Sequence, residues 1–316
     1  MSVAERVGRG SAPARVALAG NPSDGYGGAV LAVALPAFCA EVRVAPGSDR
    51  RPDHGPESEL VAAAVARFAR ETGIGGASTC GVSWRTAVPR GVGLGGSSAI
   101  VIATLRALCE LFDVSLGADQ LAGLALAVET EELGIAAGLQ DRVAQAHGGL
   151  TFMDFAAAGP GSGHGRYEPL DPALLPPLVV CWRDESAADS GLTHSDLRER
   201  FDRGDRLVGD GLAAAAAAAR DAHAALLAGD HGAFARAVDA TFDARQRMLP
   251  LDSRHVEMIA AARAAGAAAN YTGSGGAIVA VCSDESHRRK VSSALSGLPG
   301  LGVIETDHAG ASADSS

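Results

Sequence analysis

The chain of 316 residues contains one lysine, Lys290, which lies near the C-terminus and outside any glycine-rich segment. A P-loop needs a Gly-Lys-Ser/Thr run to hold nucleotide phosphates, and a protein kinase needs a lysine on a strand for the same purpose. The sequence therefore excludes both of these classes. A nucleotide bound by this chain would have to be held by backbone amides and a helix N-terminus.

Long apolar runs, paired cysteines and an excess of basic residues are also missing. No apolar stretch approaches the roughly 20 residues of a membrane span, and the N-terminal residues lack the apolar segment of a signal peptide. The five cysteines are scattered without a CxxC pair, which predicts free thiols in a reducing cytoplasm. The net charge of −10 argues against nucleic acid as a partner. We expect a cytoplasmic protein with a small-molecule ligand, and the composition indicates no particular oligomeric state.

The sequence does contain a glycine-rich stretch, PRGVGLGGSSA, at residues 89–99. It leads into residues 100–112, where Val101, Leu105 and Leu108 lie on one face of a predicted helix. Glycine permits close backbone approach, and a helix N-terminus carries unpaired N–H groups and a partial positive charge. Together they predict a phosphate-binding loop. Its expected contacts are Pro89, Gly91, Gly93, Leu94, Gly95, Gly96, Ser97, Ser98 and Ala99.

Two other interpretations of this stretch stay open. One is a glycine-rich turn that holds no ligand. The other is a dinucleotide site, because Gly91, Gly93 and Gly96 match GxGxxG, although that pattern expects an apolar strand directly before the first glycine and Pro89 and Arg90 intervene here. The serine pair favours a phosphate and metal site, in which Ser98 would place its hydroxyl on Mg²⁺.

A metal that bridges phosphates also needs a carboxylate. Glu129 and Asp141 are the candidates, in the run ETEELGIAAGLQD, where Gly134 interrupts the helical pattern and lets the next helix fold back. The alternative is that these acids are solvated helix carboxylates, and it applies above all to Glu131 and Glu132.

The periodicity predicts a mixed α+β protein in two halves. Helices are expected at residues 60–72, 100–112, 119–133, 137–147, 195–202, 209–228, 233–248, 252–265 and 287–295, and strands at 15–19, 29–35, 38–44, 80–88, 149–155, 178–182, 277–282 and 302–306. Residues 156–177 are rich in Gly, Pro and Ala and are the predicted linker. The expected division is a disordered leader over 1–13, domains over 14–176 and 177–308, and a disordered tail over 309–316.

Four motifs in family order resemble those of the GHMP kinases, named for galactokinase, homoserine kinase, mevalonate kinase and phosphomevalonate kinase. RVALAGNPSD, from Arg15 to Asp24, resembles the first motif and PRGVGLGGSSA the second. The spacing from Glu129 through Gly134 and Gly138 to Asp141 resembles the metal-binding glutamate and catalytic aspartate of the galactokinase type. NYTGSGGAIVAVC, at residues 270–282, resembles the third glycine motif.

Longer segments are similar to plant-type glucuronokinases, which phosphorylate the anomeric hydroxyl of D-glucuronate with ATP and Mg²⁺. They are GNPSDGYGG, GLQDRVAQAHGGLTFMDF, DSGLTHSDLRERF and RMLPLDSR. One departure separates the chain from galactokinases, whose first motif has an acid and a histidine where Asn21 and Pro22 stand here. Galactose is therefore not the expected substrate.

The resemblance implies a two-domain α+β GHMP kinase fold, with a ribosomal-protein-like N-terminal domain of the βαβ type, a ferredoxin-like C-terminal domain and the active site between them. Asp141 would face the sugar hydroxyl as the catalytic residue, and Arg15 would keep its carboxylate ionised. Ser98 and Glu129 would hold Mg²⁺. The ATP site would be closed by the third glycine motif, through Gly273, Ser274 and Gly275.

A uronate substrate adds a carboxylate, which arginine can bind in bidentate fashion. Substrate contacts are expected from Asp24, Arg142, Arg183, Asp189 and Ser190, although either Arg142 or Arg183 would also suit a structural salt bridge. Three alternatives remain: a GHMP kinase for another sugar such as galacturonate, arabinose or a heptose; a GHMP-fold sensor that binds without turnover; and a nicotinamide oxidoreductase.

Overall fold

The computed structural model describes residues 6–47, 56–156, 165–183 and 190–306. Contacts divide the chain into two compact units: unit 1 is Met1–Ala14, Leu35–Val88 and Gly95–His147, and unit 2 is Arg15–Ala34, Pro89–Leu94 and Gly148–Ser316. This division differs from the boundary expected near residue 176, because strands β1 (Gly8–Ala19) and β2 (Ala29–Pro46) each run through both units.

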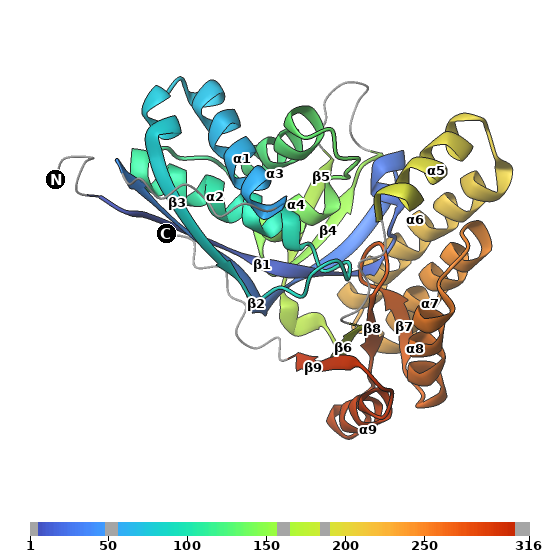
Figure 1. The fold of residues 1–316 in the computed structure, drawn as a ribbon. Helices are drawn as coiled ribbons and strands as arrows, with labels where there is room; N and C mark the ends of the chain where they lie inside the picture. The colour runs from blue at the N-terminus through green and yellow to red at the C-terminus, as the bar shows by residue number, and fades with distance from the viewer. Residues whose placement is uncertain (1–5, 48–55, 157–164, 184–189, 307–316) are drawn as a thin grey trace. The chain divides into compact units, whose positions relative to one another are not determined.

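Unit 1 is built mainly from four helices, drawn from blue to green in Figure 1: α1 (Pro56–Thr72), α2 (Gly96–Phe112), α3 (Ala118–Ala127) and α4 (Gln140–His147). Helix α2 is apolar on nearly all sides and is buried accordingly. A π-helical turn, Val128–Glu132, continues α3. Strand β3 (Cys80–Thr86) pairs antiparallel with the second half of β2, with Val42 opposite Trp84.

Unit 2 contains the rest of the first sheet, whose order is β1-β2-β4-β5 with β3 also beside β2. Strand β4 (Leu150–Asp154) pairs antiparallel with the first half of β2, with Leu31 opposite Phe152. Strand β5 (Arg166–Leu170) pairs antiparallel with β4. These pairings place the apolar side chains of β2 and β4 in the core.

A second, antiparallel sheet of unit 2 has the order β7-β8-β6-β9. Its strands are β6 (Leu178–Arg183), β7 (Ala268–Tyr271), β8 (Ala277–Val281) and β9 (Leu301–Thr306). Helices α5 (Ser190–Asp202), α6 (Arg206–Leu227), α7 (His231–Met248) and α8 (Ser253–Ala264) form the first crossover, and α9 (Glu285–Ser296) forms the second. The resulting βαββαβ order is that of a ferredoxin-like domain.

Four sequence predictions need correction. The leader expected over residues 1–13 is wrong from Gly8 onward, where β1 begins. The linker expected over 156–177 contains strand β5. The two strands expected over 29–44 are one continuous strand, β2, in which Pro36 is exposed. Strand β7, just before the third glycine motif, was not predicted. The tail over 309–316 lies outside the described residues.

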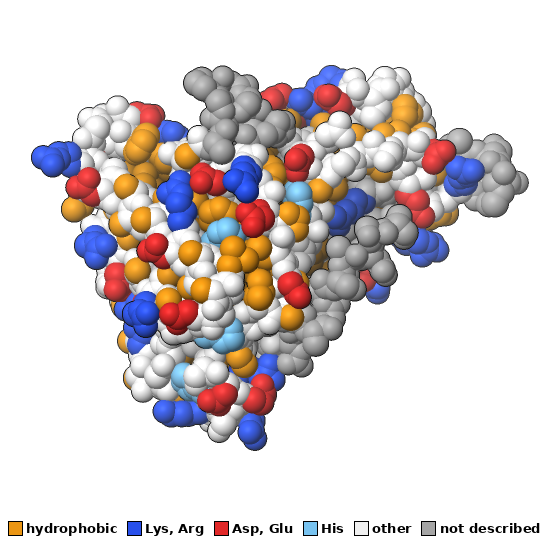
Figure 2. All heavy atoms as spheres, turned by 180° about the vertical axis from the view of Figure 1, so that it is seen from behind, with side chains coloured by type: hydrophobic (Ala, Val, Ile, Leu, Met, Phe, Trp, Pro, Cys, Tyr) orange, Lys and Arg blue, Asp and Glu red, His pale blue; other side chains and the backbone are white. Residues whose placement is uncertain are grey.

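The surface and the cysteines agree with the composition. On the face shown in Figure 2, acidic and basic side chains are interspersed. All five cysteines are free, as predicted. Within the described residues, no helix combines the length and the hydropathy that crossing a membrane would require.

Candidate active site

The glycine stretch adopts the backbone that its composition predicts. Gly91, Gly93 and Gly95 all have positive φ angles, of 66°, 74° and 75°. Gly95 is the N-cap of α2, and the first bond of the helix runs from the N–H of Ala99 to the Gly95 carbonyl. The amides of residues 96–98 therefore precede this bond and remain at the helix N-terminus as donors for an anion.

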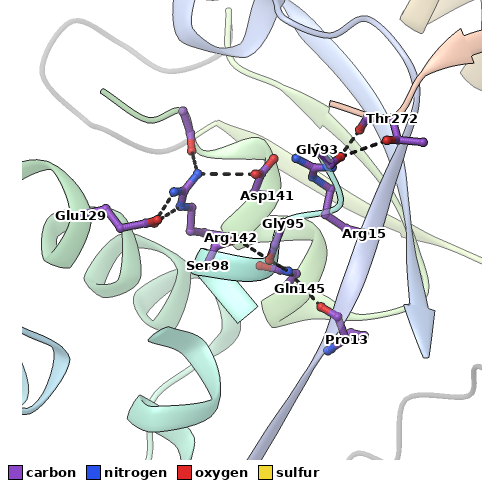
Figure 3. A network of polar contacts seen from close by, with 11 residues as sticks. Pro13, Arg15, Gly93, Gly95, Ser98, Glu129, Asp141, Arg142, Gln145 and Thr272 are labelled. Atoms are coloured by element: carbon purple, nitrogen blue, oxygen red, sulfur yellow. Dashed lines mark hydrogen bonds and ion pairs between the residues drawn. The ribbon is translucent and has the colours of Figure 1, made fainter. Parts of the chain in front are cut away.

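The carbonyl of Gly95 is held from several sides within unit 1 (Figure 3). It accepts hydrogen bonds from Ser98 Oγ at 3.1 Å and from Gln145 Nε2 at 2.8 Å, and Gln145 also donates to the carbonyl of Pro13 at 2.9 Å. Ser98 is 1% exposed, whereas Ser97 is exposed. Gln145 was not predicted as a site residue, because a glutamine one helical turn after Asp141 carries no signal until the fold brings Gly95 to it.

Glu129 and Arg142 form a buried ion pair in unit 1, with 2% and 5% of their surfaces exposed. Arg142 donates from Nε to Glu129 Oε2 at 2.6 Å and from Nη2 to the same oxygen. Its Nη1 donates to the Gly138 carbonyl at 2.8 Å and lies 3.8 Å from Asp141 Oδ2. Three residues predicted from the sequence are thus neighbours (Figure 3): Glu129 as metal ligand, Asp141 as catalytic acid and Arg142 as substrate arginine.

The residues near Glu129 suit a magnesium ion only in combination with a nucleotide. In the described part of the chain, no group of three or more Asp, Glu, His or Cys side chains could hold a metal. Mg²⁺ commonly takes one or two carboxylates and completes its shell with phosphates and water. Because both Arg142 donors use Oε2, the Oε1 atom of Glu129 is the oxygen that such an ion would take.

In unit 2, Arg15 ties the first glycine stretch to the third motif. Its Nη1 donates to the carbonyl of Gly93 at 2.6 Å and to that of Thr272 at 2.8 Å, and Thr272 Oγ1 donates to Gly93 at 2.9 Å (Figure 3). The Arg15 backbone N–H also donates to the Leu94 carbonyl. Arg15 therefore shapes both glycine turns, and its predicted action on Asp141 stays a prediction.

Two buried asparagines, which the sequence analysis did not assign to the site, join the first motif to the third. Asn21 Nδ2 donates to the Tyr271 carbonyl at 3.0 Å, and Asn270 Nδ2 donates to Asn21 Oδ1 at 2.9 Å and to the Leu18 carbonyl at 3.2 Å. Asn21 stands where galactokinases have an acid, and here its amide serves the backbone. Asn21, two residues after the apolar strand β1, was the available signal, whereas Asn270 lies within β7, which was not predicted.

The remaining predicted substrate residues are spread over unit 2. Asp24 lies half-buried in the 3-10 turn Ser23–Tyr26. Arg183 ends β6, where it donates to the Pro299 carbonyl at 3.2 Å and lies 3.9 Å from Glu257. Ser190 begins α5, and only its backbone is described. Asp189 lies outside the described residues.

Gly273, Ser274 and Gly275 form the turn between β7 and β8. A Cβ atom on Gly93 would lie 2.8 Å from the Gly275 carbonyl oxygen, so the two glycine turns of unit 2 are in direct contact. A side chain at Gly93 would force the turns apart.

We expect Gly93→Ala to lower the free energy of unfolding more than Gly229→Ala does. Both glycines have positive φ, 74° and 67°, so both substitutions carry the left-handed penalty of about 1–2 kcal/mol. Only Gly93 has a backbone neighbour in the way, whereas a Cβ on Gly229 would meet nothing within 4 Å. Overpacking should add at least about 1 kcal/mol at Gly93. Urea unfolding of the two variants measures the difference, and equal losses would contradict the contact.

Family models identify the class of protein to which the chain belongs. The family model "GHMP kinases N terminal domain" matches residues 59–149, and "GHMP kinases C terminal" matches residues 222–298. The chain belongs to the GHMP kinase family. GHMP kinases use ATP as the phosphate donor, and the protein is accordingly a kinase with an alcohol group as acceptor.

Among individual relatives, Glucuronokinase 1 of Arabidopsis thaliana is 35% identical over 303 residues, which span 85% of this chain and 83% of the relative. A D-glycero-D-manno-heptose 1-phosphate kinase structure from Bacteriodes thetaiotaomicron has a TM-score of 0.70 at 22% identity, covering 96% of this chain and 99% of its own. Streptococcus pneumoniae phosphomevalonate kinase has a TM-score of 0.77 at 16% identity, covering 95% and 99%. These two structures confirm the two-domain GHMP kinase fold.

Proposed function

We propose that the protein is a sugar-1-kinase that transfers the γ-phosphoryl group of ATP to the anomeric hydroxyl of D-glucuronate, giving glucuronate 1-phosphate. The observation that carries the proposal is the similarity to Arabidopsis Glucuronokinase 1, at 35% identity over most of both chains. The clustering of Glu129, Asp141 and Arg142 in unit 1 supports it, because a phosphoryl-transfer enzyme needs carboxylates placed beside its phosphate loop.

In this proposal, phosphoryl transfer depends mainly on positioning and charge neutralisation. Amides at the N-terminus of α2 hold phosphate oxygens, and Gln145 and Ser98 fix the Gly95 carbonyl so that these amides keep their direction. Asp141 accepts the proton of the sugar hydroxyl through a carboxylate oxygen. Glu129 and Ser98 would hold Mg²⁺, which would neutralise phosphate charge when bound.

Arg142 and Arg183, the two arginines expected to contact the substrate carboxylate, differ in the partners that they already have. Arg142 donates from Nε and Nη2 to Glu129 and from Nη1 to the Gly138 carbonyl. A bidentate contact with a substrate carboxylate therefore requires that the pair with Glu129 open. Arg183 already binds the Pro299 carbonyl, and its ion pair with Glu257 is long at 3.9 Å. Asp24 and Ser190 would contact sugar hydroxyls.

The test is ADP release in the presence of ATP and a panel of sugars: D-glucuronate, D-galacturonate, L-arabinose, a heptose and D-glucose. We expect D-glucuronate to give the highest kcat/KM, with neutral sugars at least about 10-fold poorer because they lose a charged hydrogen bond of about 1.5–3 kcal/mol. A higher kcat/KM for another sugar would reassign the substrate. Nucleotide binding without turnover of any sugar would instead favour the sensor.

A further inference from the structure

Arg245, in helix α7 of unit 2, is buried with only part of its hydrogen-bonding capacity used. It is 2% exposed, and its Nη2 donates to the carbonyl of Ser274 at 3.2 Å. Its Nε and Nη1 atoms are buried and have no hydrogen-bond partner among the described residues. No aspartate or glutamate in that part of the chain forms an ion pair with it. The side chain therefore holds a positive charge and two donors in reserve.

Such a charge is unfavourable unless an anion joins it. Burial lowers the pKa of Arg245 to about 10, so the guanidinium stays protonated at neutral pH. A buried charge without a partner loses its hydration and gains nothing in exchange, and an arginine cannot escape by releasing its proton near neutrality. A buried polar group without a partner calls for an explanation, and a bound ion or ligand is one of them.

Two neighbouring side chains, Tyr271 and His255, are also buried with a polar atom that has no hydrogen-bond partner among the described residues. The Tyr271 ring lies under the Arg245 guanidinium at 5.2 Å, and the His255 ring contacts the edge of Tyr271 at 6.0 Å between centroids. The hydroxyl of Tyr271 and Nε2 of His255 are buried without a partner among the described residues. Burial raises the pKa of Tyr271 and lowers that of His255, so both are neutral near pH 7.

The nearby acid is already engaged. Asp252 caps α8 and accepts from Arg254 Nε at 3.2 Å and Nη2 at 2.7 Å, and these bonds lower its pKa to about 2. It is therefore a committed partner of Arg254. Among the described residues, no carboxylate pairs with the cluster formed by Arg245, Tyr271 and His255.

This cluster lies directly beneath the third glycine motif. Arg245 binds the Ser274 carbonyl, and a Cβ on Gly275 would lie 3.4 Å from His255 Nδ1. Ser274 and Gly275 are half-buried, so the turn is the part of this region that faces outward. The same turn contacts Gly93 of the phosphate loop. The Arg245 guanidinium therefore lies next to a turn that is only half-buried and that contacts Gly93.

We infer that Arg245, with the Tyr271 hydroxyl, forms the subsite for the carboxylate of the sugar acid. The guanidinium keeps Nε and Nη1 as unused donors on its two sides, so a carboxylate oxygen can accept a charged hydrogen bond there and its charge compensates the buried arginine. The inference rests on the proposed function. It differs from the earlier expectation for Arg142 and Arg183, each of which lies within ion-pair distance of a glutamate in this structure.

The test compares D-glucuronate with D-glucuronamide, which has the same shape without the charge. Wild type, Arg245→Met and Arg263→Met are measured for kcat/KM and for ligand affinity by calorimetry. Arg263 is the matched control, because it also stacks on an aromatic ring, at 5.1 Å from Phe242, but is paired with Asp239 and Asp243. We expect wild type and Arg263→Met to prefer the acid by about 100-fold, and Arg245→Met to lose that preference.

Stability provides a second readout. Arg245→Met removes an uncompensated buried charge. The melting temperature of the ligand-free variant should therefore lie about 2 °C or more above that of wild type. Glucuronate should raise the melting temperature of wild type only. If Arg245→Met fails to fold, Arg245→Lys keeps a charge without the planar fork and should show a reduced preference for the acid.

The two proposals fail in different ways. Should wild type turn over the amide as fast as the acid, the sugar-acid substrate is wrong, and the carboxylate subsite is overturned with it. Should wild type prefer the acid and Arg245→Met keep that preference, the substrate stands and only the Arg245 subsite is overturned. If chloride or inorganic phosphate raised the melting temperature of wild type as much as glucuronate does, the site would be a general anion site. That result would also overturn the Arg245 carboxylate subsite.

Discussion

Asp141→Asn is expected to lower kcat for phosphoryl transfer by about 10²- to 10⁴-fold, the range of a lost general base. The substitution keeps the shape of the side chain and removes its charge and its capacity to take a proton. Asp141 lies in the first turn of α4, and its Oδ2 is 3.8 Å from Arg142 Nη1, so the amide should leave the local fold intact. The dissociation constant of ATP should change little. Rapid-quench kinetics and calorimetry measure the two quantities.

Asp119→Asn is the matched control for this experiment. Asp119 also belongs to unit 1 and also carries a partner, His147 Nε2 at 2.8 Å, but it lies at the exposed start of α3. Its substitution should leave kcat within about twofold, as expected for an exposed pair. An Asp141→Asn variant with the turnover of wild type would remove the assigned role, and a large loss of ATP affinity would indicate that Asp141 acts on the nucleotide.

The parts of the site that are local in sequence could be predicted. Gly91, Gly93 and Gly95 need positive φ, and the apolar run after them forms a buried helix, so the turns of the glycine stretch and α2 follow from composition and periodicity. The third glycine turn and strand β8 after it follow in the same way. The strand that precedes it, β7, is only four residues long and carries no alternation of its own.

The start of β1 shows why composition misled. Gly, Ser, Pro and Ala over residues 8–14 are typical of a disordered leader. In the fold, Gly8 and Gly10 lie so close to α2 that a Cβ on either would collide with the carbonyls of Ala107 and Ala103. Small residues stand there because a strand packs tightly against a helix. That requirement comes from a partner about a hundred residues away and has no local signature.

The sequence also could not predict which acceptor each arginine side chain contacts. Arg142 follows the predicted catalytic acid and was therefore assigned to the substrate, yet the turn after Gly138 directs its guanidinium to Glu129. Arg245 has the same residue type and stands in a helix of ordinary amphipathic pattern, where nothing marks it as unpaired. Which arginine pairs with an acid is decided by tertiary packing alone.

The Glu129–Arg142 pair carries the largest expected effect on stability. Glu129→Gln removes the carboxylate that accepts from Arg142 Nε and Nη2 and leaves the buried guanidinium near the Gly138 carbonyl and the more distant Asp141. Removing one partner of a buried pair typically costs about 3–5 kcal/mol, because the other charge stays desolvated. We expect that loss in urea unfolding, measured without Mg²⁺ or nucleotide so that any role of Glu129 in metal binding does not contribute.

The double variant Glu129→Gln/Arg142→Met separates pairing from packing. With both charges gone, the desolvation penalty disappears, so the double variant should be more stable than Glu129→Gln alone, and the cycle should give a coupling of at least about 1 kcal/mol. The pair Arg85 and Glu41, exposed on strands β3 and β2 of the same unit, is the control and should couple by less than about 1 kcal/mol. Additive losses at positions 129 and 142 would mean that the two charges are independently solvated and that Arg142 is available to a substrate after all.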